Sequence, residues 1–161
     1  MTDVLPLLQD FYREKLTQLL RHQDAAQSVG QYDINNTYQY IINREEVQLT
    51  WIAKAIQDLG GAVVDAVEPD RQTSAKRADT AHIMIEQDGH DAQAFVDRWR
   101  PRIDAMSNAR HAKMLRVVIG ETLEQKRFFE QALAGRTDLL GKRGVAVGPS
   151  HGSVLPSRWI E

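Results

Sequence analysis

Two stretches with the apolar spacing of a helix each carry a carboxylate at a position that should face a core. Glu45 lies in the first stretch with Gln48 three residues later, and Glu121 lies in the second with Glu124 three residues later. The apolar positions are Ile41, Leu49, Ile52, Ile56 and Leu59 in the first and Met114, Val118 and Phe128 in the second. A carboxylate facing a core is costly unless it is paired, protonated or bound to a cation. Because facing helices of a bundle can hold two metal ions through Glu-x-x-ligand pairs, these four residues are candidate metal ligands.

The same acids have a second interpretation that needs no metal. Arginines near them in the sequence, Arg13, Arg44 and Arg127, or buried water would neutralise the carboxylates. Buried charges in proteins are ordinarily paired in this way. Metal binding and charge pairing both remain open from the residues alone.

Four helices are predicted to position these side chains. Apolar residues three and four positions apart indicate helices over about 4–22, 32–59, 91–103 and 107–134. Between them, residues 23–30 are predicted to form a short connection, and residues 62–88 a long crossover with a short helix near 74–86. A crossover of this length carries the chain back along the axis of a bundle.

Several residues mark where these helices should begin and end. Asp33 and Ser107 are candidate caps for the second and fourth helices. Gly60 and Gly135 should end the same two helices, because glycine readily takes the left-handed conformation found there. Pro101 should kink or end the third helix.

The fold class predicted from these elements is all-α. An antiparallel four-helix bundle is expected over residues 1–140, followed by an irregular arm at residues 141–161 that contains four glycines and two prolines. The arm ends in Trp159-Ile160-Glu161, and its apolar pair would serve as an anchor. It would dock on its own bundle, on a second subunit or on a foreign partner. The expected assembly is a homodimer.

Composition excludes several classes of function. The chain has 161 residues, no cysteine and a formal net charge of -2. Thiol chemistry is therefore excluded, and we expect neither membrane adsorption nor general nucleic-acid binding. No apolar run approaches the roughly 20 residues of a membrane span, and no secretion signal is recognisable, so a cytoplasmic protein is expected. A basic stretch at 98–116 around Trp99 leaves phosphate or nucleic-acid binding as a third function, against a simple solvated corner.

The two motif segments resemble a known family. The sequence at 44–61 is REEVQLTWIAKAIQDLGG and the sequence at 120–133 is GETLEQKRFFEQAL. They resemble the ferritin-like four-helix-bundle proteins related to rubrerythrin, in which a Glu-Glu-x-x-His motif leads into a helix closing with Leu-Gly-Gly. In this chain Gln48 and Glu124 stand at the two histidine positions. As a pattern of helices, the resemblance covers residues 4–134.

The resemblance implies a wider ligand set. It requires one carboxylate from the first helix, for which Glu14 is the candidate, and one from the third. A turn near Asp104 would bring Asp91 back to the level of Glu121, with His90 beside it as an imidazole donor. The cofactor implied is iron or manganese, although an amide oxygen in place of histidine binds iron weakly and the site could hold no metal.

The resemblance also implies a chemistry. A dinuclear carboxylate site would handle metal ions, peroxide or O2, with Tyr38 either donating electrons or packing in the core. The alternative is a metal-free ferritin-like scaffold that acts through protein–protein association. Whether the chain is an enzyme at all is left open by its sequence.

Overall fold

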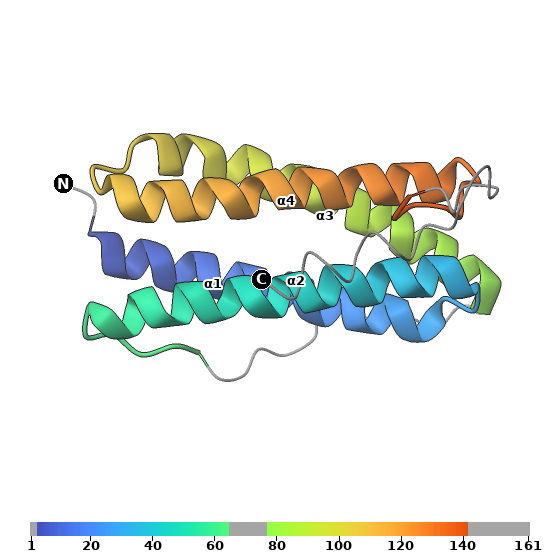
Figure 1. Ribbon diagram of the computed structural model, residues 1–161, viewed down its shortest axis with the longest axis horizontal. Helices are drawn as coiled ribbons and strands as arrows, with labels where there is room; N and C mark the ends of the chain where they lie inside the picture. The colour runs from blue at the N-terminus through green and yellow to red at the C-terminus, as the bar shows by residue number, and fades with distance from the viewer. Residues whose placement is uncertain (1–2, 65–76, 142–161) are drawn as a thin grey trace, which may run out of the picture.

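The computed structural model describes residues 3–64 and 77–141, and these form four helices. The helices are α1 (Val4–Ser28), α2 (Tyr32–Asp58), α3 (Arg77–Asp104) and α4 (Ala109–Leu133). They pack lengthwise as two antiparallel hairpins, α1 with α2 and α3 with α4 (Figure 1). The predicted all-α antiparallel four-helix bundle is confirmed.

A single long connection joins the two hairpins. Helices α2 and α3 run in the same direction along the bundle, so the chain must return along its length between Asp58 and Arg77 (Figure 1). Bundles with one such crossover form a recognised class. Residues 65–76 of this crossover, and residues 142–161 of the predicted arm, lie outside the described residues.

Helix α1 is longer than the sequence predicted. It continues through the predicted connection at 23–30 and ends at Ser28. Ala25 and Ala26 are buried in this extra length, which gives the added turns an apolar face that two small residues made hard to recognise. The cap of α2 also differs from the prediction. Gln31, not Asp33, accepts a hydrogen bond from the backbone N–H of Ile34, at 2.6 Å.

Helix α3 begins at Arg77, well before the predicted start near Asp91. Residues 77–86 of the predicted short helix form its first part, and residues 74–76 lie outside the described residues. Met84 and Ile85 are buried at this end, but the surrounding sequence is polar enough to hide the helical period. Pro101 lies inside the helix, which ends three residues later at Asp104. The predicted end of the helix close to Ile103 is confirmed, with Pro101 inside the last turn.

Helix α4 lies almost where it was predicted. Its cap is Asn108, one residue after the predicted Ser107, and the Asn108 side chain accepts from the N–H of His111 at 3.0 Å. Gly60 and Gly135 follow α2 and α4 with φ angles of 80° and 89°, in the left-handed region predicted for them.

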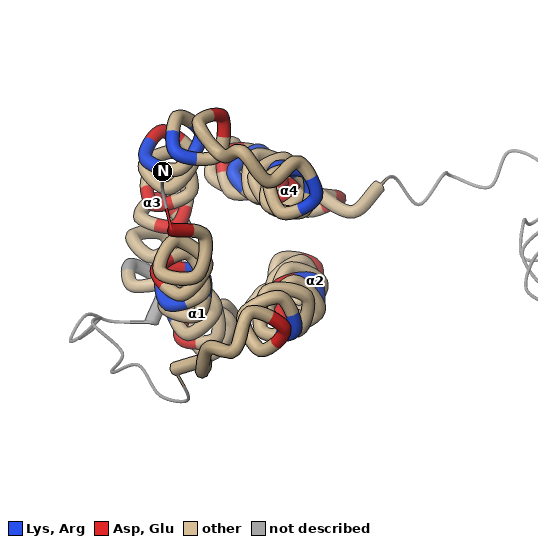
Figure 2. Tube along the Cα trace, turned by 90° about the vertical axis from the view of Figure 1, so that its left-hand side faces the viewer, with Lys and Arg blue, Asp and Glu red and all other residues tan. Residues whose placement is uncertain are grey.

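The core divides into two apolar clusters, one toward each end of the bundle. One is built around Phe11, Phe95 and Trp99, and the other around Tyr38 and Phe129. The end-on view in Figure 2 shows the four helices at the corners of a square, with α2 and α4 approaching each other less closely than the partners in either hairpin. No helix among the described residues is long and apolar enough to cross a membrane.

Candidate functional site

A layer of buried polar side chains separates the two apolar clusters. It takes residues from all four helices, which distinguishes it from an ordinary cap or surface network. Its members are Lys15, Gln18 and His22 of α1, Glu45 and Gln48 of α2, Asp88 of α3, and Thr122 and Gln125 of α4. We refer to these eight residues as the polar layer.

Glu45 and Lys15 form the centre of the polar layer. Both side chains are 0% exposed, and Lys15 Nζ lies 3.2 Å from Glu45 Oε2. The same ammonium donates to Gln18 Oε1 at 2.8 Å and approaches Thr122 Oγ1 at 3.4 Å. The ammonium nitrogen therefore has three oxygen atoms within 3.4 Å, one as an ion pair and two as hydrogen-bond acceptors. The prediction that Glu45 would face the interior is confirmed, and the positive charge beside it belongs to the protein.

His22 holds the other oxygen of Glu45. Its Nδ1 contacts Glu45 Oε1, and its ring packs against Tyr38 and Phe129. Burial by itself would lower the pKa of His22, but the negative charges of Glu45 and Asp88 and the hydrogen bond to Glu45 raise that pKa above its ordinary value. The imidazole is therefore held toward its protonated form, in which Nδ1 donates to Glu45.

The acids of the polar layer, Glu45 and Asp88, have hydrogen-bond or cationic partners within it. Burial would raise the pKa of Glu45, but the charges of His22 and Lys15, together with their hydrogen bonds, keep it below its ordinary value. Asp88 accepts a hydrogen bond from the Tyr38 hydroxyl at 2.7 Å. When His22 is protonated, its charge and that of Lys15 face the carboxylates of Glu45 and Asp88. A buried set of charges is tolerated when it is paired and hydrogen-bonded in this way.

Glu121 occupies the edge of this layer, not its centre. Its side chain is 31% exposed, and Arg44 Nη2 lies 2.6 Å from Glu121 Oε1. Gln48 donates from its amide nitrogen to the other carboxylate oxygen. Gln48 Oε1 is left buried without a hydrogen-bond partner among the described residues. The structure therefore brings the predicted ligands Gln48 and Glu121 together. They form a hydrogen bond, and Arg44 forms an ion pair with the same carboxylate.

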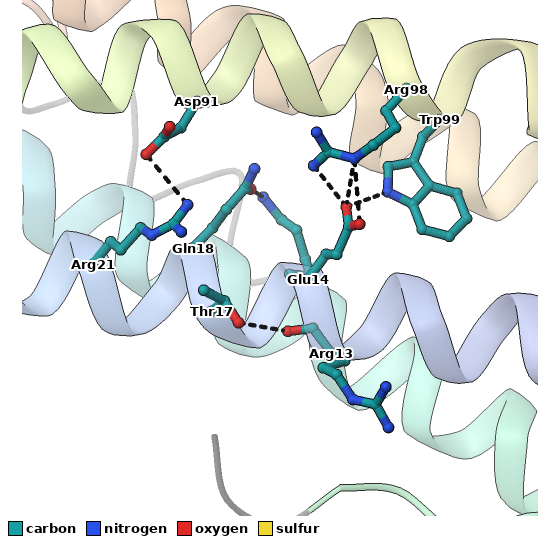
Figure 3. A network of polar contacts seen from close by, with 9 residues as sticks. Arg13, Glu14, Thr17, Gln18, Arg21, Asp91, Arg98 and Trp99 are labelled. Atoms are coloured by element: carbon teal, nitrogen blue, oxygen red, sulfur yellow. Dashed lines mark hydrogen bonds and ion pairs between the residues drawn. The ribbon is translucent and has the colours of Figure 1, made fainter. Parts of the chain in front are cut away.

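Glu14 and Asp91 lie on the outside of the α1–α3 side and also have cationic partners (Figure 3). Glu14 accepts from Arg98 Nη2 at 2.8 Å and from the indole N–H of Trp99 at 2.5 Å. Asp91 is 3.3 Å from Arg21 Nη1. Both acids thus join α1 to α3.

The last two predicted ligands are on the surface. Glu124 is half exposed and lies 3.8 Å from Arg127 of its own helix. His90 is 79% exposed, with Glu86 4.0 Å away. Neither side chain is among the buried members of the polar layer.

The donor set found here does not fit a metal ion as the side chains stand. No group of three or more His, Asp or Glu side chains in residues 3–64 and 77–141 is placed to hold one. Each of the five predicted carboxylate ligands has a Lys, Arg or His partner instead. Their assignment as metal ligands stays a prediction.

Sequence reasoning missed the two residues that matter most to Glu45. Lys15 and His22 were not considered as its partners, although Lys15 comes four residues after Phe11 and four before Leu19, on the apolar stripe of α1. A lysine on the apolar stripe of a helix was the signal that could have indicated a buried cation. The predicted pairing of acids with Arg44 and Arg127 is confirmed, whereas Glu14 pairs with Arg98 instead of Arg13.

The basic corner at 98–116 is partly neutralised by acids. Arg102 lies 3.6 Å from Asp10 and stacks 4.0 Å from the centre of the Trp99 ring. Arg116 is 3.3 Å from Asp104. With Arg98 bound to Glu14, three arginines of the corner have carboxylate partners, which favours a solvated corner over a phosphate-binding surface.

Comparisons with known proteins add no family to this description. No protein-family model matches the chain. No curated protein and no solved structure matches it either.

Proposed function

We propose that this protein is a metal-free four-helix scaffold that acts through protein–protein association. The observation that carries the proposal is the Lys15 ammonium, which lies 3.2 Å from Glu45, the fully buried one among the predicted carboxylate ligands. In a bundle built to hold metal between its helices, a cation from solution supplies this positive charge. Here a side chain of α1 supplies it.

A metal ion would have to compete with that side chain. Two like unit charges about 4 Å apart repel by about 4 kcal/mol at an effective dielectric constant of about 20, and a divalent ion doubles the repulsion. Lys15 would have to lose its proton or leave the layer, and His22 would have to release the second oxygen of Glu45. Both changes work against binding, so the arrangement favours a core without metal.

Exposed apolar side chains support association. Tyr40 and Val47 are 47% and 39% exposed, and their seven-residue spacing puts them on one face of α2. Val117 of α4 is 46% exposed. Single exposed apolar residues are common, but a pair in helical register is how one helix presents itself to another. The expected partner is a second copy of the chain, because two-fold homodimers are the commonest protein assemblies.

Elemental analysis tests the metal-free core. We expect protein purified without chelator to carry no more iron, manganese or zinc than the double variant Glu45→Ala/Glu121→Ala. Bound metal in the wild type that is absent from the double variant would overturn the proposal. Lys15→Met is a useful third sample, because it removes the competing ammonium and leaves the carboxylates in place.

The mass of the full chain in solution tests association. We expect a concentration-dependent dimer, and a shift toward monomer in Tyr40→Ser/Val47→Ser. Ile83→Ser is the matched control, since Ile83 is 45% exposed but lies on α3. A wild-type chain that stays monomeric at high concentration would contradict the association half of the proposal and leave the metal result standing.

Metal or peroxide handling is the second candidate. It is supported by Gln48 Oε1, a buried acceptor with no hydrogen-bond partner among the described residues, and by the orientation of Glu45 toward the interior. Manganese accepts such oxygen donors better than zinc does. This candidate gains weight if Lys15→Met binds manganese and the wild type does so as well.

A further inference from the structure

A groove opens between α2 and α4 on the side where these helices are less closely packed. It has a volume of about 330 Å³, and its walls include Thr50, Trp51 and Leu59 from the end of α2 and its cap and His111 and Met114 from the start of α4. Trp51 and Leu59 are 37% and 43% exposed. The volume is at the small end of the range for ligand pockets, which run from about 300 to 1,000 Å³, so it suits one large side chain.

One residue that lines this groove has a buried polar atom without a partner. His111 Nδ1 is buried and makes no hydrogen bond within the described part of the chain. A neutral histidine ring has one acceptor nitrogen, and burying it unpaired costs free energy. The complementary occupant is therefore a flat apolar group with a single N–H donor. The indole of tryptophan has this character, because its nitrogen donates and does not accept.

The chain itself contains such a group within reach. The described residues end at Gly141, which lines a hollow with Asp33 and Thr37 at the start of α2. From that level to the groove is about 20 residues along α2, or about 30 Å at about 1.5 Å per residue. Trp159 follows Gly141 by 18 residues, which span up to about 60 Å when extended. The segment between Gly141 and Trp159 is therefore long enough to reach the groove.

We propose that the α2–α4 groove is the docking site of the chain's own C-terminal segment, with Trp159 in the groove and its indole N–H donating to His111 Nδ1. Ile160 then covers the apolar rim beside Met114. Glu161 comes near Arg110, a basic residue of the same groove. Val154 and Leu155, the other large apolar residues near the end, have no side-chain donor to offer His111.

This inference goes beyond the proposed function and can fail separately from it. The metal content of the polar layer and the mass of the chain do not depend on what fills the groove. An intramolecular occupant nevertheless narrows the surface on which a second copy could dock, because it covers Trp51.

Disulfide trapping tests the docking, since the chain has no native cysteine to interfere. The variant Thr50→Cys/Ile160→Cys puts one thiol at the groove and one at the end of the segment. The control is Ala94→Cys/Ile160→Cys, because Ala94 lines a hollow between α1 and α3 on another side of the bundle. We expect an intrachain disulfide in the first protein at a rate that is independent of concentration and severalfold above the control.

Two results would overturn the proposal. Disulfides that form between chains would show that the occupant comes from a second copy. A trapping rate no greater than that of the control would show that the segment does not dock in the groove. Adding Trp159→Ser to the trapping variant should slow intrachain trapping by about tenfold, which corresponds to about 1.4 kcal/mol. Trp159→Phe should have a smaller effect, because it keeps the apolar ring and loses only the N–H.

A second measurement avoids the new cysteines. The variant Trp51→Phe keeps two tryptophans, Trp159 and Trp99, of which Trp99 is fully buried. Acrylamide quenching then reports on Trp159, and we expect it to be severalfold weaker than in the same protein carrying His111→Lys. Equal quenching in the two proteins would refute the contact with His111 even if the disulfide variants fail to fold.

Discussion

Glu45 and Glu121 hold matching places in two similar motifs, yet their surroundings differ completely. Glu45 is 0% exposed and is held by Lys15 and His22, whereas Glu121 is 31% exposed and is held by Arg44 and Gln48. The spacing of a motif sets the helix face on which a carboxylate lies. The depth of that carboxylate depends on how closely the neighbouring helix packs, and α2 and α4 pack less closely than α1 and α2.

The two acids should therefore have different weight in the free energy of unfolding. Removing one member of a buried ion pair lowers the free energy of unfolding strongly, because the other charge is left buried without a partner. Removing one member of a pair that solvent reaches lowers it little. Four predictions test this contrast, starting with the largest effect.

Lys15→Met should destabilise the protein by about 3–5 kcal/mol, because it leaves the Glu45 carboxylate buried with His22 as its remaining partner. Urea unfolding followed by circular dichroism measures this. The matched control is Arg44→Met, which removes the cation from the half-buried acid. If the two variants lose equal stability, the contrast between the acids is wrong.

Removing both members of the central pair should recover most of that loss. In Lys15→Met/Glu45→Leu neither charge of the pair remains, and His22 can become neutral because the Glu45 charge that raises its pKa is gone. Apolar replacements of buried ion pairs are often neutral or stabilising by about 1–4 kcal/mol. The double variant should therefore be more stable than Lys15→Met alone. Additive losses in the double-mutant cycle would show that Lys15 and Glu45 do not interact.

Stability should pass through a maximum with pH. The pKa of Glu45 is lowered by folding, so its contribution is full above its unfolded value near 4.5 and is lost as pH falls through the folded pKa. The pKa of His22 is raised, so its contribution is full below its unfolded value near 6.5 and is lost as pH rises through the folded pKa. His22→Gln should flatten the alkaline side, and thermal unfolding across the pH range would show whether it does.

The smallest effect is expected at Glu121. Arg44→Met should cost about 0.2–1 kcal/mol, as is usual for exposed ion pairs, and the loss should shrink as salt is added. Urea midpoints at low and high salt provide the measurement. A loss as large as that of Lys15→Met, unaffected by salt, would mean that the Arg44–Glu121 pair is effectively buried.

The sequence predicted best where local signals were strong. Helices α2 and α4 were located to within a few residues, because apolar stripes ended at Gly60 and Gly135. The start of α3 was missed, since its first turns are mostly polar and their few buried residues, such as Met84, are held by contacts distant in the sequence. Periodicity cannot reveal a helix whose apolar face is that sparse.

The sequence predicted the buried acid of the candidate site but not its cationic partners. The inward orientation of Glu45 followed from its place between Ile41 and Leu49. Its partners Lys15 and His22 could not be identified in the same way, because lysine on an apolar stripe usually extends its charge to solvent along its flexible stem. Only the packing of α1 against α2 and α3, with Thr122 of α4 on the opposite side of the core, encloses that stem and leaves the ammonium no route to water.

The Lys15 ammonium has one further consequence, which concerns the alignment of the helices. It contacts side chains of α1, α2 and α4 at once. Sliding α1 by one turn, about 5.4 Å, would strand this charge in an apolar cluster. Competing registers are thereby excluded, as a single buried polar residue excludes them in coiled coils. We expect the apolar double variant to keep its helices but to give broader, more heterogeneous NMR signals than the natural chain.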